Sequence, residues 1–257
     1  MKSQVAAKGH GGGPDDVGLR VILGPTCCGK TGRAVHLAKE SGAPVIAVDR
    51  IQVYEDLAIA SGRPPDDELD GTTRIYLDHR VTTSWPVEMT AAEGLRRLRR
   101  LITDAPPGVI LEGGSISLWR GFFAERYAQA NVSEIVVRRV DDWHRFARRV
   151  EQRILELLRS EPRSMLDELE VTLTDHRSRR LVLGMVGMRE LHEWTERQCV
   201  APESLGDVKH DLEMCRSLAA HVTPAWVRHA QMQQAAFERF LPEYEHAVEL
   251  VQDLDAP

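Results

Sequence analysis

Eight residues, Gly24 to Thr31, carry the most specific chemical pattern in the chain. Their sequence, Gly-Pro-Thr-Cys-Cys-Gly-Lys-Thr, fits the phosphate-binding loop (P-loop) pattern G-x-x-x-x-G-K-[ST]. Glycines let backbone N–H groups converge on a phosphate, and the N-terminus of a following helix adds a partial positive charge. In this pattern Lys30 reaches the terminal phosphate, and the hydroxyl of Thr31 can ligate Mg²⁺. The loop therefore predicts a site for a diphosphate or a triphosphate.

Two carboxylates stand at the ends of predicted strands, where ligands meet open α/β sheets. Asp49 follows the apolar run 44–48 and could be a Mg²⁺ ligand, a general base or a helix cap. Glu112 ends the run 108–111 and is followed by Gly-Gly-Ser. This is not the apolar run followed by Asp that marks a Walker B strand, so the pattern disfavours a motor-type ATPase.

The elements that must position these residues alternate between strand and helix. Each expected strand is an unbroken apolar run, which is typical of a parallel sheet buried on both faces. We therefore predict an α/β fold with a P-loop NTPase-like parallel sheet and a helical C-terminal portion. The expected strands are 19–23, 44–48, 108–111 and 133–140, and the expected helices are 29–41 and 88–103.

The pattern changes at about Asp141, where apolar residues begin to recur with the 3.6-residue period of a helix. No convincing strand follows. Further helices are expected at 177–197, 206–221 and 224–251. The predicted organisation is a disordered lead-in (1–18), a P-loop α/β domain (19–140) and a mainly helical domain that completes the site (141–257).

Composition excludes several classes of protein. The 257 residues carry a formal net charge of −6, which disfavours binding to a nucleic acid polymer. No apolar run is long enough for a membrane span, and residues 1–18 contain no apolar signal segment. The four cysteines lack zinc-ligand spacing. We therefore expect a cytoplasmic protein without a structural metal and without a membrane partner.

Four segments of the chain resemble one enzyme family. Residues 24–31, 48–64, 73–80 and 109–118 are similar to the bacterial adenylate dimethylallyltransferases, the isopentenyltransferases of cytokinin biosynthesis. The resemblance is dense over 19–120 and can be traced to about residue 240. Related tRNA dimethylallyltransferases share the P-loop and the Asp-x-x-Gln-Val-Tyr segment at 49–54. They carry a different glycine-rich turn at 112–118 and add a helical insertion, for which this chain leaves little room.

The resemblance implies a reaction and a set of roles. A dimethylallyl group, or its hydroxylated form, would pass from its diphosphate to N6 of AMP, with Mg²⁺ as cofactor and diphosphate as second product. Asp49 would be the general base, aided by Thr26 and Lys30. The acceptor and prenyl group would meet Asp49, Ser61, Trp226 and His229. The expected diphosphate-binding residues are Gly24, Pro25, Thr26, Cys27, Cys28, Gly29, Lys30, Thr31 and one arginine, Arg159 or Arg163.

The chain departs from the family at two positions. Trp226 replaces a tyrosine and so lacks a phenol hydroxyl that could bind the diphosphate. Val186 stands where the bacterial members have an aspartate that helps to hold the adenine amine. The alternatives are a tRNA dimethylallyltransferase, a P-loop kinase for nucleotides or small molecules, and a nucleotide sensor without catalysis. A kinase would need a lid with an arginine pair, which is not evident, and a sensor would need no base at Asp49.

Overall fold

The computed structural model describes residues 18–125, 131–240 and 248–252, so the predicted lead-in 1–18 lies outside it except for Gly18. All neighbouring strands are parallel, which confirms the predicted α/β sheet. The strands are β1 (Leu19–Leu23), β2 (Val45–Ala47), β3 (Arg74–Tyr76), β4 (Ile110–Glu112), β5 (Val132–Arg139) and β6 (Val248–Gln252). Their order in the six-stranded sheet is β3-β2-β4-β1-β5-β6. The glycine-rich loop therefore follows a central strand, β1.

The helices fall into two groups along the chain. Those before β5 are α1 (Lys30–Ser41), α2 (Asp66–Leu69), α3 (Ala91–Asp104) and α4 (Ile116–Phe123), with a 3₁₀ turn at Glu55–Leu57. Those after β5 are α6 (Trp143–Leu158), α7 (Met165–Thr174), α8 (Arg179–Val182), α9 (Met188–Arg197), α10 (Leu205–Val208) and α11 (Leu212–Glu238), with a 3₁₀ turn at Pro202–Ser204. Side chains of Thr90, Asp142, Ser164 and Asp211 cap the N-termini of α3, α6, α7 and α11.

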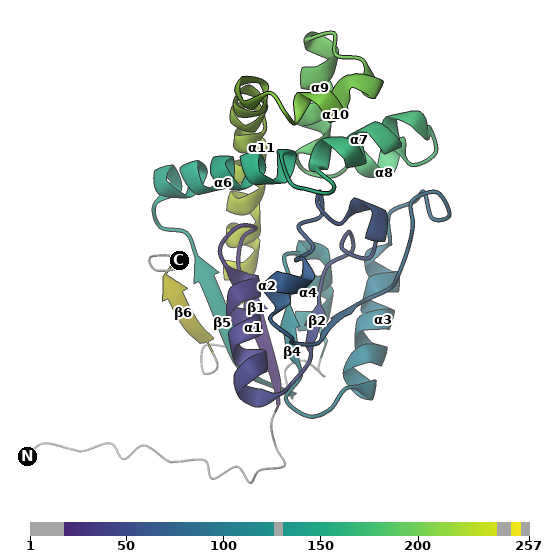
Figure 1. Ribbon diagram of the computed structural model, residues 1–257. Helices are drawn as coiled ribbons and strands as arrows, with labels where there is room; N and C mark the ends of the chain where they lie inside the picture. The colour runs from purple at the N-terminus through teal and green to yellow at the C-terminus, as the bar shows by residue number, and fades with distance from the viewer. Residues whose placement is uncertain (1–17, 126–130, 241–247, 253–257) are drawn as a thin grey trace, which may run out of the picture.

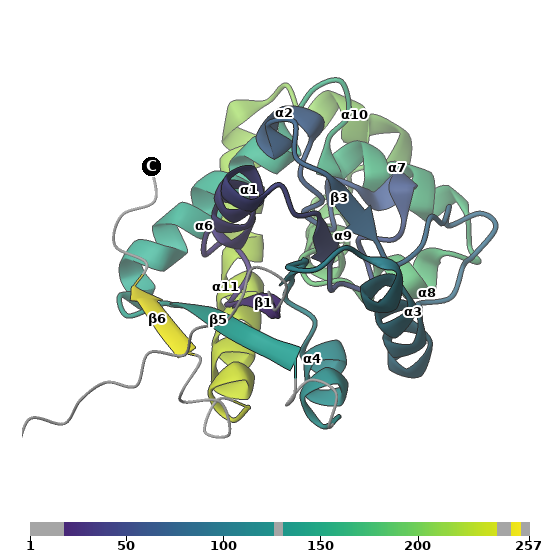
Figure 2. The ribbon, with the colours of Figure 1, turned by 90° about the horizontal axis from the view of Figure 1, so that it is seen from below.

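Alternation along β1 divides the apolar side chains between the two faces of the sheet. Ile22 packs with Ala34 and Leu37 of α1 on one face. Val21 and Leu23 join the larger core on the other face, which α3, α4 and α11 cover (Figure 2). Helices α6 to α10 form a separate layer beyond the carboxyl ends of the strands (Figure 1). Helix α11 runs from this layer down beside the sheet and connects the two parts.

Two strands were not expected from the sequence. Strand β3 has only three residues, one of them charged, so it gives no apolar run. Strand β6 falls where we predicted a helix over 224–251 and no strand after 141, and both expectations are wrong there. The segment Val-Glu-Leu-Val-Gln is too short to distinguish the period of a helix from that of a strand, and pairing with β5 selects the extended form. The segment 141–257 thus returns to the sheet, although residues 241–247 lie outside the described residues.

The helical boundaries also differ from the prediction. The expected helix 177–197 is interrupted between α8 and α9, where Gly187 has φ 95°. Conversely, α11 continues through Pro224, where we ended one helix and began another. A proline inside a helix costs about 3 kcal/mol. The hydroxyl of Thr223 donates to the carbonyl of Ala219 at 2.7 Å, and buried residues flank the proline, so tertiary packing outweighs the local cost.

Within the described ranges, no helix is both long enough and apolar enough to span a bilayer.

Candidate active site

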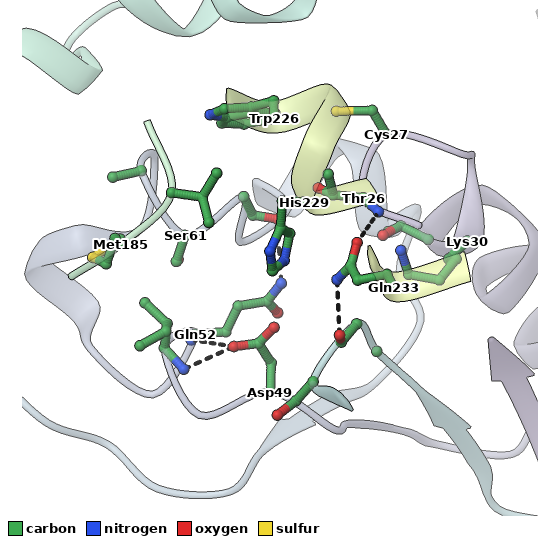
Figure 3. A pocket seen from close by; sticks show the side chains of 18 of the residues that line it. Thr26, Cys27, Lys30, Asp49, Gln52, Ser61, Met185, Trp226, His229 and Gln233 are labelled. Carbon is green, nitrogen blue, oxygen red and sulfur yellow. Dashed lines mark hydrogen bonds between the residues drawn. The ribbon is translucent and has the colours of Figure 1, made fainter. Parts of the chain in front are cut away.

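A large cavity opens at the carboxyl ends of β1, β2 and β4, beneath the helical layer (Figure 3). Its volume is about 820 Å³, within the size range of small-molecule sites. The loops after β1 and β2 and the turn after β4 contribute to its lining. Helices α6 and α11 and residues within 181–186 contribute to it from the helical layer. Both parts of the chain therefore build one site.

The first wall of the cavity comes from residues 24–31, and we call it the 24–31 wall. Gly29 precedes α1 with φ 78°, a left-handed conformation that favours glycine. No side chain caps the N-terminus of α1, so its first amide groups lack the partner that Thr90 gives to α3. The residues of this wall that line the cavity are Thr26, Cys27, Gly29, Lys30 and Thr31. The loop has the form of an anion-binding helix N-terminus.

The charged group of this wall is Lys30, which is only 9% exposed. Its ammonium group donates to the carbonyl of Pro25 at 2.6 Å. An ammonium has three donors, so this bond leaves two for a ligand. The neighbouring Cys27 is half-buried, and loss of contact with water raises the pKa of its thiol. Cys27 thus adds no negative charge to the loop at neutral pH.

A glutamine from α11 joins the 24–31 wall to the turn after β4. The side-chain carbonyl of Gln233 accepts from the backbone N–H of Thr26 at 2.8 Å. Its amide group donates to the carbonyl of Gly114, also at 2.8 Å. Figure 3 shows both bonds across one carboxamide. Gln233 was not identified from the sequence, because a lone glutamine in a helix carries no motif.

The second wall, which we call the 49–64 wall, begins with Asp49. One carboxylate oxygen, Oδ1, accepts from the backbone N–H groups of Ile51 at 2.7 Å and Gln52 at 3.2 Å. The other oxygen makes no hydrogen bond to the described residues. Burial raises the pKa of Asp49, and the nearby charge of Glu112 adds to the rise, against the two amides and Lys30. The carboxylate is held by one oxygen and can take a proton on the other.

Glu112 also faces the cavity, but it is committed to an ion pair. Its carboxylate accepts from Arg74 of β3 at 2.6 Å, and the two side chains are only 3% and 2% exposed. Arg74 also donates to the side-chain carbonyl of Gln52 at 3.2 Å. This pair explains how the charged side chain of Arg74 can be buried, and it leaves Asp49 as the better candidate for a base.

The far end of the 49–64 wall is held by the helical layer. Glu168 of α7 is almost fully buried, and its two oxygens accept from the backbone N–H groups of Ile59 at 2.9 Å and Ala60 at 2.8 Å. Ser61 follows directly and lines the cavity, with its hydroxyl donating to the carbonyl of Ala58 at 3.1 Å. Burial raises the pKa of Glu168 to about 7, although the two amides oppose this.

Helix α11 presents three residues to the cavity at helical spacing, Trp226, His229 and Gln233. Trp226 is 6% exposed, and its indole N–H has no hydrogen-bond partner among the described residues. The ring of His229 points into the cavity, toward the side on which Gln52 and Asp49 lie (Figure 3). Burial, and then the charge of Lys30, lower the pKa of His229, so its imidazole is neutral at pH 7.

A family model described as isopentenyl transferase matches residues 17–247 of this chain. The chain belongs to the isopentenyl transferase family.

Eight curated relatives of this isopentenyl transferase share one name. "Adenylate dimethylallyltransferase" of Rhizobium radiobacter is 34% identical, over 85% of this chain and 92% of the relative. Proteins of the same name from Rhizobium rhizogenes (34% identical, 86% and 92% covered) and Rhodococcoides fascians (32% identical, 86% and 88% covered) also match. This confirms the resemblance drawn from the sequence.

Two solved structures of similar fold are titled as tRNA enzymes. A tRNA isopentenylpyrophosphate transferase of Staphylococcus epidermidis superposes with a TM-score of 0.64 at 13% identity, covering 91% of this chain and 93% of that one. The Bacillus halodurans enzyme gives 0.64 at 17% identity, with 94% and 91% covered. This likeness confirms the P-loop NTPase-like fold.

The structure brings most of the predicted site residues of this isopentenyl transferase to one cavity. These are Thr26, Cys27, Gly29, Lys30, Thr31, Asp49, Ser61, Trp226 and His229, and Val186 lies there too. Gly24, Pro25 and Cys28 do not line it. A Cβ on Gly24 would lie 2.7 Å from the sulfur of Cys28, which explains the glycine. Their proposed roles in binding stay predictions.

Neither predicted arginine reaches the cavity, which corrects our expectation. Arg159 directly follows the last residue of α6. Arg163 donates to the backbone carbonyl of Asp56 at 2.8 Å and lies 4.0 Å from Glu168. Arg149 and Arg153, one to three turns earlier on α6, line the cavity instead. The sequence showed a basic helix but could not show which of its faces meets the site.

Proposed function

We propose that this isopentenyl transferase moves a dimethylallyl group from dimethylallyl diphosphate to N6 of AMP and releases diphosphate. The observation that carries the proposal is the placement of Asp49 in the same cavity as the 24–31 wall. A carboxylate with one oxygen available thus faces an anion-binding loop. The names of the curated relatives support the same acceptor and donor.

The proposed step is a displacement at C1 of the donor. The lone pair of N6 forms a bond to C1 while the bond from C1 to the diphosphate oxygen breaks, and the diphosphate leaves with that electron pair. The N6 proton passes to the oxygen of Asp49 that makes no bond to Ile51 or Gln52. An aromatic amine is a weak nucleophile, so a carboxylate hydrogen-bonded to it lowers the barrier.

The leaving diphosphate gathers negative charge, and the 24–31 wall supplies cations and N–H donors against it. Lys30 would keep its bond to Pro25 and turn its remaining donors to the diphosphate. Arg153 of α6 would approach from the opposite side. It is now paired with Glu68 of α2 at 3.3 Å, with its side chain 37% exposed, so it can exchange partners.

Magnesium fits this site if the bound diphosphate supplies most of its protein-independent ligands. Mg²⁺ prefers oxygen ligands and often takes only one or two from the protein, with phosphate oxygens and water completing its shell. Thr31 lines the cavity next to Lys30 and offers a hydroxyl. Among the described residues, no group of three or more His, Cys, Asp or Glu side chains is arranged to hold a metal. Bound there, Mg²⁺ would neutralise the charge of the diphosphate.

The acceptor would lie against the 49–64 wall, with Ser61 beside the adenine and the neutral His229 opposite. A neutral imidazole provides a hydrogen bond and no charge, so His229 is suited to orienting a substrate more than to binding diphosphate as a cation. Trp226 would form an apolar wall. Val186 brings no carboxylate to the adenine, so Asp49 and Ser61 carry its recognition.

A tRNA adenosine is the second candidate acceptor, favoured by the similarity to the two bacterial tRNA enzymes. A net charge of −6 opposes it, since binding to a polyanion gains from basic surface. We also propose that the enzyme works in the cytoplasm, because all four cysteines are free thiols.

The test is an incubation of the purified protein with Mg²⁺, dimethylallyl diphosphate and one acceptor at a time: AMP, ADP, ATP or an unmodified tRNA. Mass spectrometry reads the prenylated product, and a coupled assay reads the released diphosphate. Product on AMP with equimolar diphosphate supports the proposal. Product on tRNA alone would select the second candidate. Consumption of ATP without the prenyl donor would point to a kinase and overturn both.

A further inference from the structure

Helix α11 carries two consecutive glutamines that bind the backbone in the same way at different places. Gln233 bonds to Thr26 and Gly114, both at 2.8 Å. Gln234 accepts from the backbone N–H of Val140 at 2.8 Å and donates to the carbonyl of the same residue at 3.3 Å. Each carboxamide thus uses its acceptor and its donor on main-chain groups near the carboxyl ends of the strands.

The two glutamines differ in what they hold. Thr26 and Gly114 line the cavity, as does Gln233 itself, whereas Val140 and Gln234 do not. Gln233 is 3% exposed. A Cβ on Gly114 would lie 2.6 Å from the side-chain nitrogen of Gln233. The absence of a side chain at Gly114 therefore leaves the space that this carboxamide fills, and the contact is too tight to admit a further carbon atom.

The position of Gln233 on α11 connects this contact to the rest of the site. Trp226, His229 and Gln233 are spaced at i, i+3 and i+7 and face the cavity together (Figure 3). A bond that fixes Gln233 against the 24–31 wall also fixes the height and rotation of the helix face that carries His229 and Trp226. One carboxamide thus sets the distance between the wall and that face.

We propose that Gln233 is a positioning residue for prenyl transfer, whose carboxamide holds the anion-binding loop, the turn after β4 and helix α11 in register. It contacts Thr26 and Gly114 and needs no contact with the reacting atoms. The inference rests on the proposed function for the identity of the donor, but the diphosphate-binding test below does not depend on the acceptor. A displacement of about 1 Å of a substrate-holding group can cost about 10²-fold in rate.

The experiment compares Gln233→Leu with Gln234→Leu in the full chain. Both substitutions remove two hydrogen bonds to backbone, so both should lower the melting temperature. We expect Gln233→Leu to reduce kcat by about 10²-fold and to weaken the binding of inorganic diphosphate with Mg²⁺ by about tenfold. Gln234→Leu should stay within about twofold of wild type in both. Steady-state kinetics and calorimetric titration give the two readouts.

A second pair of variants keeps the test sharp if Gln233→Leu does not fold. Gln233→Glu retains the acceptor for Thr26 but sets a carboxylate against the carbonyl of Gly114. Gly114→Ala disturbs the same contact from the other partner. We expect both to reduce kcat more than KM is raised, with diphosphate binding weakened. Gln233→Asn, which keeps the carboxamide on a shorter arm, should recover part of the loss.

The results have distinct meanings for the two proposals. Equal kinetics in the Gln233 and Gln234 variants, or a change only in melting temperature, would overturn the positioning role. Diphosphate binding that depends on Gln233 in an enzyme that does not prenylate AMP would support the positioning role and refute the acceptor assignment alone.

Discussion

The two walls of the cavity are built in opposite ways. The 24–31 wall is one continuous loop between a central strand and the helix that follows it. The 49–64 wall depends on distant parts of the chain, because Glu168 of α7 holds Ile59 and Ala60 from more than one hundred positions away. The first wall carries most of its geometry in its own residues, with one long-range bond from Thr26 to Gln233 of α11. The second takes its geometry from the helical layer.

The chemistry of the 24–31 wall needs one short segment of the chain. The chemistry of the 49–64 wall needs several distant segments that the fold brings together. Binding an anion with backbone N–H groups needs glycines at set spacing and a helix N-terminus, and eight residues can supply both. Placing Asp49 and Ser61 against a bound nucleotide needs two loops and α7 to agree in position. Substitutions that remove a charge should therefore act directly, and those that loosen a contact should act through geometry.

The substitution with the largest expected effect is Asp49→Asn, which tests the chemistry of the 49–64 wall while sparing its shape. The asparagine oxygen can still accept from Ile51 and Gln52, so the loop should hold. Loss of the base should lower kcat by about 10²–10⁴-fold. Stopped or quenched turnover assays measure the loss, and an unchanged melting temperature checks the fold. Full activity would end the assignment of Asp49 as base.

The pH profile of the same residue sharpens this prediction. Burial raises the pKa of Asp49 above its ordinary value of 3.8, and only the ionised form can take a proton. For the wild type, kcat/KM should therefore fall as the pH drops through a pKa higher than 3.8. Asp49→Asn should lack this acidic limb. A limb at the ordinary aspartate value would contradict the burial argument.

Lys30→Ala tests the 24–31 wall and ranks second. Removing its ammonium should lower kcat by about 10²–10³-fold and weaken diphosphate binding, because the leaving group loses a fixed cation. Lys39→Ala provides a matched control from the last turn of α1, where the ammonium is about half exposed and pairs with Asp70. The control should stay within about twofold of wild type. Equal losses in both would indicate a general charge effect.

Replacing the arginine of α6 that we propose to bind diphosphate should have an effect of intermediate size on the KM for the donor. Arg153→Gln should raise the KM for the donor by about 10–100-fold, the usual worth of a charge-assisted bond to phosphate. Arg159→Gln, at the end of the same helix, should leave KM within about twofold. Kinetics with the donor varied at saturating acceptor decide between them. The reverse ranking would restore Arg159 as the diphosphate ligand.

The smallest expected effect is on stability and concerns the contact that holds the 49–64 wall. Glu168 has an ordinary pKa of 4.5, raised to about 7 in the folded chain. Between these values the unfolded chain releases this proton first, so the free energy of unfolding should fall as pH rises, by up to about 3 kcal/mol. Urea unfolding at about pH 5 and about pH 7.5 measures this slope for the wild type.

Glu168→Gln should remove that slope, because a carboxamide does not titrate. Glu170→Gln, two positions along the same helix, should retain it. Above pH 7 the variant also lacks one acceptor for Ile59 and Ala60, so the KM for AMP should rise about threefold to tenfold. An unchanged slope in Glu168→Gln would assign the pH dependence to another group.

The features that could be predicted from the sequence are those that depend on local residues, and the features that could not are those that depend on distant ones. The sheet, the position of α1 and the lining by Lys30 and Asp49 were all predicted, because each depends on a local motif or an unbroken apolar strand. Gln233 and Glu168 could not be predicted, since a buried glutamine or glutamate in a helix has no sequence signature until its partner is known. Arg153 was missed for a related reason, because periodicity defines helix faces but not the neighbour that each face meets.

The two unexpected strands show the limit of apolar patterns. Strand β3 contains Arg74, whose buried side chain pairs with Glu112 at the end of another strand. Strand β6 is a short segment whose form is decided by the open edge of β5. In both, long-range pairing overrides the local preference, and no window of single-sequence periodicity contains both partners.

The bond between Thr26 and Gln233 joins residues 207 positions apart. On the ribosome, the loop that follows β1 emerges early, yet one of its amide groups finds its partner only when α11 has been made and has docked. The sheet can begin to form before that, since β1, β2 and β4 are already available. The final arrangement of the anion-binding loop is therefore among the last steps of folding, and a nascent or truncated chain that ends before α11 should bind diphosphate poorly.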